Sequence, residues 1–131
     1  MIEAPAWIDK RAVLLLHQEN LAQFGGTVGL RDEGALDAAL ARPINKFRDD
    51  GCKSPAALAS AYASGLVRDQ PFVDGNKRAA LMAVGVFLAI NGYRLAAKRI
   101  EAIEAIMAFA AGDLEEPRFA DWIETCLLAK A

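Results

Sequence analysis

The sequence has little of what metal-binding and nucleic-acid-binding domains usually carry. Its 131 residues include only one histidine and two cysteines, and Cys52 and Cys126 lie too far apart for a common metal-ligand spacing. Acidic residues outnumber basic ones by 17 to 15, so the basic excess typical of a domain that binds nucleic-acid phosphates is missing. We therefore expect free thiols in a reducing compartment and no direct binding of nucleic acid.

Long apolar runs and alternating patterns are missing as well. The longest apolar run, 79–90, is shorter than the roughly 20 residues that cross a bilayer. The first residues, 1–9, contain acidic residues and a proline instead of the basic and apolar regions of a signal peptide. Without period-two alternation, the Ala- and Leu-rich composition favours helices. These features predict a soluble, cytoplasmic, all-α protein with no membrane contact, forming a single domain over 1–131.

Capping residues and glycines predict where the helices begin and end. Asp9, Asp32 and Ser54 are suited to cap helix starts, and Pro43 is expected to stop the second helix, which leaves the polar stretch 45–53 as a loop. A brief extended piece is expected at 93–95. The predicted helices cover 10–23, 33–42, 55–68, 76–91, 100–111 and 117–128. The result is a compact bundle of about six helices around a central helix, 76–91, buried on all sides.

The segment 70–78, Gln-Pro-Phe-Val-Asp-Gly-Asn-Lys-Arg, carries the features of an anion site. A short loop leads into a helix N-terminus, where free N–H groups and the helix dipole attract phosphate. Lys77 and Arg78 in the first turn oppose that dipole by about 0.3–1 kcal/mol each, a penalty that an anionic ligand would remove. Asp74 could hold a magnesium ion that bridges phosphate oxygens. The alternative is that Asp74 caps the helix and both cations are merely solvated.

Phe72, Asp74, Gly75, Asn76, Lys77 and Arg78 match, in order, the motif H-x-F-x-D/N-A/G-N-K-R of the Fic/Doc family. The chain resembles the Doc (death-on-curing) branch of that family over nearly its whole length. The flanking segments that carry this similarity are 24–34, 87–92 and Gly112-Asp113. The resemblance implies a Fic/Doc-type helical fold.

The resemblance also implies a function. Fic proteins typically transfer AMP from ATP to a protein hydroxyl, and their motif has glycine where Lys77 stands. Doc toxins, with lysine there, pass the terminal phosphate of ATP to a threonine of elongation factor Tu and so stop translation. A Phd-type antitoxin blocks their site. Lys77 therefore favours phosphate transfer, with ATP and Mg2+ as cofactors.

The resemblance assigns a role to each matched position. Phe72 would anchor the loop in the core, and Asp74 would bind magnesium as part of the catalytic set. Gly75 and Asn76 would shape the phosphate nest, while Lys77 and Arg78 would neutralise phosphate charge in binding and catalysis.

Two residues outside this match also bear on the site. Arg68 matches a family arginine and would contact nucleotide or substrate, unless it is a surface cation at a helix end. The lone histidine, His17, is expected to be a structural or surface residue of the first helix.

The chain departs from the motif at its catalytic base, where Gln70 replaces the family's histidine. A glutamine amide forms hydrogen bonds but cannot keep a proton, and loss of a general base typically costs about 10²–10⁴-fold in rate. We expect ATP and Mg2+ binding to survive and turnover to fall. The substitution is either engineered, to silence a toxin, or natural, in a decayed or repurposed member. Asp69 is a weaker option for a substitute base.

Three functions remain open at this point. The first is a Doc-type kinase toxin weakened by Gln70. The second is an enzyme that transfers AMP. The third is a non-catalytic module that binds an antitoxin.

Overall fold

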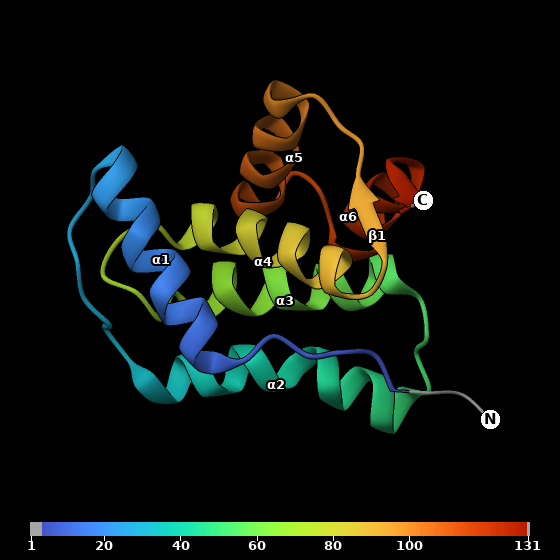
Figure 1. Ribbon diagram of the computed structural model, residues 1–131, viewed down its shortest axis with the longest axis horizontal. Coiled ribbons are helices and arrows are strands. Elements are labelled where there is room, and N and C mark those ends of the chain that lie inside the picture. The colour runs from blue at the N-terminus through green and yellow to red at the C-terminus, as the bar shows by residue number, and fades with distance from the viewer. Residues whose placement is uncertain (1–3, 131) are drawn as a thin grey trace.

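The computed structural model describes residues 4–130, and the regular secondary structure within this range is helical except for one short pair of strands (Figure 1). The all-α prediction is confirmed. The elements in chain order are α1 (Lys10–Phe24), α2 (Glu33–Asp50), α3 (Pro55–Asp69), α4 (Asn76–Ile90), β1 (Tyr93–Leu95), α5 (Arg99–Ala111), α6 (Glu116–Thr125) and β2 (Leu127–Ala129).

The predicted capping residues begin three of the helices. The carboxylate of Asp9 accepts a hydrogen bond from the Arg11 N–H at 2.7 Å, and that of Asp32 accepts one from the Ala35 N–H at 3.0 Å. The Ser54 hydroxyl accepts from the Ala57 N–H at 3.1 Å. Each bond satisfies a backbone donor that has no partner inside its helix.

The core is organised around α3, which packs against α2, α4 and α6. Eleven of its 15 residues are buried, and most of them are Ala, Ser or Gly. Small side chains allow neighbouring helix axes to come close. At Gly65 an added Cβ would lie 2.7 Å from the backbone Cα of Ala39 on α2, so only glycine fits there. In Figure 1, α2, α3 and α4 lie as a layer, which α1 crosses on one side and α5 covers on another.

The helix predicted to be buried on all sides, α4, is buried on one face only. Its six buried residues face α3 and the core. Leu81 and Met82, on another face, are half-buried and line a cleft. One apolar face of α4 therefore packs in the core and another lines the cleft. Composition alone does not distinguish these two faces.

The expectation that Pro43 ends the second helix is wrong. The helix continues to Asp50, so most of the loop predicted at 45–53 is helical. Pro43 is buried against the core, and Phe47 packs edge-on against Trp7 with ring centroids 5.7 Å apart. This packing offsets the loss of a helical hydrogen bond at proline, which costs about 3 kcal/mol in an exposed helix.

The last helix also differs from its predicted range, 117–128, because it ends at Thr125. The chain then forms β2, which pairs antiparallel with β1, the predicted extended piece at 93–95. Strand pairing with a distant segment competes with helix continuation, and no local signal in the sequence reports it. Among the helices of residues 4–130, none is long and apolar enough to cross a membrane.

Candidate functional site: a phosphate-binding turn at the mouth of a cleft

The loop between α3 and α4 is held in place by the loop between α1 and α2. The Arg31 side chain donates to the carbonyl oxygens of Asp69 and Gln70, both at 2.7 Å. Leu30 and Phe72 form an isolated antiparallel bridge, and the Val73 N–H donates to the Gly29 carbonyl at 3.0 Å. The motif loop therefore has a defined backbone, as a site that positions reacting groups requires.

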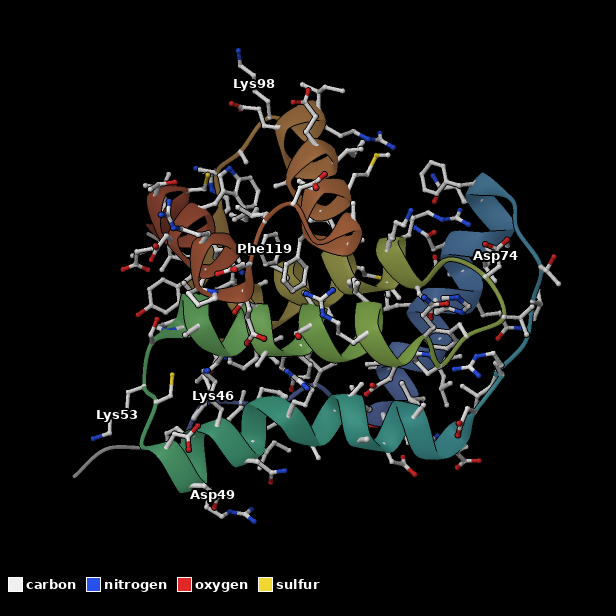
Figure 2. All side chains as sticks on the ribbon, turned by 180° about the vertical axis from the view of Figure 1, so that it is seen from behind. Lys46, Asp49, Lys53, Asp74, Lys98 and Phe119 are labelled. Carbon is white, nitrogen blue, oxygen red and sulfur yellow. The ribbon has the colours of Figure 1, made fainter. Side chains whose placement is uncertain are left out.

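Asp74 projects from this loop beside α1, as Figure 2 shows. Its two carboxylate oxygens accept backbone N–H groups, Oδ1 from Gly75 at 2.8 Å and Oδ2 from Thr27 at 3.1 Å. These hydrogen bonds, first that of Thr27 and then that of Gly75, lower the pKa of the Asp74 carboxyl below its ordinary value of 3.8, and the charge of Arg78 acts in the same direction. The side chain is exposed and ionised at neutral pH.

The N-terminus of α4 opens onto a cleft and has no side-chain cap within the described part of the chain. Its N-cap is Gly75, at φ 78°, and no side chain of residues 4–130 caps it. Asp74 therefore does not cap this helix through its side chain. This disfavours the alternative in which Asp74 serves only as a helix cap. Lys77 is exposed, whereas Arg78 is half-buried and donates from Nη1 to the Gly25 carbonyl at 2.8 Å. The first turn presents free amides and two cations on the cleft.

The side-chain amide of Asn76 forms two hydrogen bonds inside the loop that the sequence did not predict. Its side-chain Oδ1 accepts from the Phe72 N–H and its Nδ2 donates to the Phe72 carbonyl, both at 3.0 Å. The amide is thus engaged in closing the loop. Phe72 itself is 2% exposed and belongs to the hydrophobic core.

Sequence reasoning missed how closely His17 is involved in this loop. It is buried, and its ring stacks on Phe72 with centroids 3.6 Å apart. Of the two predicted alternatives, a structural or a surface residue, its burial excludes the second. Its proximity to the motif, 57 positions away along the chain, left no signal in the sequence.

Gln70 lies at the C-terminal end of α3 in the left-handed conformation, with φ 45° and ψ 62°, and lines the cleft. Arg68 is not among the lining residues; its guanidinium lies over the Phe109 ring, 5.0 Å from the centroid. Asp69 is also absent from the lining. Of the residues predicted to bind nucleotide or phosphate, Arg68 is thus the one that does not line the cleft.

The site residues open into a cleft of about 830 Å³. One end is polar and contains the motif residues, and the other is walled by α4 and α5. Arg99 of α5 also faces the cleft and lies over the Phe24 ring at 5.7 Å. The apolar wall consists of Leu81, Met82, Ala102, Ile103, Ile106, Met107 and Ala110. Ligand pockets usually measure about 300–1,000 Å³, so this cleft, with a few converging polar groups, suits a small organic ligand that carries an anionic group.

The donor set fits a magnesium-bound polyphosphate rather than a metal held by protein alone. Among residues 4–130, no group of three or more His, Cys, Asp or Glu side chains could hold an ion. Magnesium usually binds one or two carboxylates together with substrate phosphates and water. Each Asp74 oxygen accepts a single N–H and so retains a lone pair for a hard cation.

This chain is similar to a known protein family and to two known proteins. A model of the Fic/DOC family matches residues 7–88, which include the whole motif loop and most of α4. "Toxin Doc" of Mycolicibacterium smegmatis is 45% identical over 75 residues, which cover 56% of this chain and 58% of that protein. The "Protein kinase doc" of Escherichia phage P1 is 27% identical over 88 residues, 67% of this chain and 70% of that protein. The chain thus spans a little over half the length of the M. smegmatis relative. Because the family model covers more than half of it, this chain belongs to the Fic/DOC family.

Proposed function

We propose that this chain is the toxin of a toxin–antitoxin pair and transfers the terminal phosphate of ATP to a hydroxyl of a protein, namely a threonine of elongation factor Tu. The observation that carries the proposal is the group formed by Asp74, Lys77 and Arg78 around the uncapped N-terminus of α4, at the polar end of the cleft. The relatives named as a toxin and a protein kinase support it. The antitoxin would be of the Phd type, and the site of action would be the cytoplasm.

Each side chain has a part in this reaction that follows from its position. The ionised Asp74 would hold Mg2+, and the first-turn amides with Lys77 and Arg78 would bind and orient the phosphates. Bound magnesium would supply charge neutralisation at the phosphate oxygens. Positioning and electrostatics carry most of the catalysis of phosphoryl transfer, so these residues would retain much of their effect without a base.

Gln70 would limit the reaction. It lines the cleft at the family's histidine position, where it can donate or accept a hydrogen bond but cannot take the proton of the attacking hydroxyl. We therefore propose that the chain binds ATP and Mg2+ and turns over slowly.

Labelled ATP tests both the reaction and its chemistry. The Gln70→His variant is incubated with Mg2+, elongation factor Tu and ATP labelled at either the γ- or the α-phosphate. Phosphate transfer leaves the γ-label on the protein, whereas AMP transfer leaves the α-label. A variant that transfers neither label and does not arrest growth would favour the third function, a non-catalytic module that binds an antitoxin.

Ligand binding is tested separately from turnover by NMR. Addition of ATP and Mg2+ at millimolar concentration is expected to shift the backbone amide signals of residues 75–78. Unchanged signals would contradict the phosphate site itself, whatever the activity of the variant.

A further inference from the structure

A buried histidine contacts the motif loop through both its ring and its nitrogen. His17 is 5% exposed, and its ring lies at 12° to the Phe72 ring. Its Nε2 is 2.8 Å from the carbonyl oxygen of Asp74. A carbonyl oxygen only accepts hydrogen bonds, so Nε2 must carry the proton and donate. The proposed reaction uses neither contact.

The peptide group between Asp74 and Gly75 is held at both ends. Its oxygen accepts from His17, and its N–H donates to Oδ1 of Asp74 itself at 2.8 Å. Gly75 has φ 78°, and glycine tolerates conformations on both sides of the φ map. The backbone preference of Gly75 therefore does not dictate which way this peptide faces. The contact from α1 selects one orientation.

That orientation matters for the carboxylate. If the peptide turned over, the Gly75 N–H would leave Oδ1 of Asp74 and one of the two hydrogen bonds that hold the carboxylate would be lost. The same turn of chain begins α4 and sets the direction of its first free amides. Small displacements of such groups have large effects on a site that works by positioning.

We propose that His17 is a positioning residue for the phosphate site. It acts through the Asp74–Gly75 peptide, and it holds the Asp74 carboxylate and the start of α4 in the geometry that receives a magnesium-bound polyphosphate. This inference rests on the proposed function of the site.

Two substitutions separate the hydrogen bond from the packing. His17→Phe keeps an aromatic ring that can stack on Phe72 but removes the donor. His17→Gln keeps an N–H donor at a similar reach and removes the stacking. Val13→Ala is the matched control, because Val13 is 2% exposed on the same helix one turn earlier. The full chain of each variant is titrated with the non-hydrolysable analogue AMP-PNP and Mg2+ by calorimetry, and the Gly75 amide signal is recorded by NMR.

The affinity for the magnesium analogue is expected to depend on the hydrogen-bond donor at position 17. It should not depend on the stability of the fold. His17→Phe should bind the magnesium analogue about five- to tenfold more weakly, as expected for the loss of one hydrogen bond. His17→Gln should stay within about twofold of the parent chain, on the same reasoning that its donor is retained. Val13→Ala should unfold at a lower temperature and bind as the parent does.

Unchanged affinity and an unchanged Gly75 signal in His17→Phe would overturn the inference and leave His17 a purely structural residue. If His17→Phe does not fold, a tenfold loss of affinity in a natively folded His17→Gln would overturn it as well. If the parent chain does not bind the analogue at all, the proposed function fails. The Gly75 signal of unliganded His17→Phe still tests the positioning, because a signal identical to the parent's contradicts it.

Discussion

Gln70 combines an unfavourable backbone conformation with an unsuitable side chain. Apart from glycines, it is the one residue with positive φ in the described part of the chain. The left-handed region costs an ordinary residue about 1–2 kcal/mol, and Asn, Asp and His are found there more often than others. The backbone at this position thus accommodates the histidine that the family motif contains.

Gln70→His is expected to increase the rate of phosphate transfer by about 10²–10⁴-fold, because it restores a general base with a pKa near neutrality. The measurement is the initial rate with γ-labelled ATP at saturating substrate. Gln70→Asn is the control, since it also suits positive φ and has no basic group. Equal rates in the two variants would show that the base is not the missing component.

The Asp74 carboxyl is expected to stay ionised to a lower pH than an ordinary aspartate, and so to remain available to the proposed Mg2+. Hydrogen bonds from Thr27 and Gly75 lower its pKa in the folded protein below 3.8. A carboxyl with a lowered folded pKa contributes stability above its unfolded pKa, and that stability is lost as the pH falls through the folded pKa. Titration of the Asp74 side-chain carbon signal by NMR should therefore give a midpoint below 3.8. A midpoint above that value would show that the two hydrogen bonds do not persist in solution.

Among the elements, α2 and α3 pack so closely at Gly65 that there is no room for a larger residue. Gly65→Ala would bring a Cβ to 2.7 Å from the Ala39 Cα, which is backbone and cannot rotate away. We expect this variant to lose about 1–3 kcal/mol of stability, as overpacked cores do. The free energy of unfolding in urea measures it.

The same substitution in α4 provides the control. An added Cβ at Gly85 meets nothing within 4 Å. Gly85→Ala is therefore expected to stabilise the protein by about 0.4–1 kcal/mol, because alanine has less freedom to lose on folding. A destabilised Gly85→Ala would indicate that helix packing around α4 is tighter than the structure has it.

Helix starts were predicted better than helix ends. A start such as Ser54-Pro55 is marked by a side chain that caps the helix and by a proline whose missing N–H does no harm there. The ends of α2 and α6 depend on distant partners, namely Trp7 against Phe47 and β1 beside β2. Long-range packing overrode the local preference of Pro43 and of the segment after Thr125.

For the whole molecule, binding of ATP with Mg2+ is expected to stabilise the folded state. A ligand that binds only the native protein adds about 2.7 kcal/mol at 100 times its Kd. Thermal unfolding should therefore shift upward with ATP and Mg2+ together. Asp74→Asn should show little of that shift, because a neutral amide binds Mg2+ poorly. An equal shift in the parent chain and in Asp74→Asn would show that Asp74 does not bind the metal.

The features on which the proposed phosphate site depends could be found in the sequence because they are local. Residues 70–78 are contiguous, and the physical reasons for a phosphate site, namely a glycine turn, a carboxylate and two cations at a helix start, are all present in nine consecutive positions. The all-helical class followed from composition and the absence of alternation. The site features and the helical class can both be read from residues that are close together in the sequence.

The surroundings of the site were decided by tertiary contacts. Segments far from the motif in sequence supply three parts of these surroundings. They are His17, which contacts the loop, Arg31, which holds it, and the wall of the cleft formed by α5. The open face of α4 likewise depends on which helices pack against it and which do not. Folding brings these groups together by burying apolar surface, an effect without direction along the chain, so no spacing of residues in the sequence encodes which segments will meet.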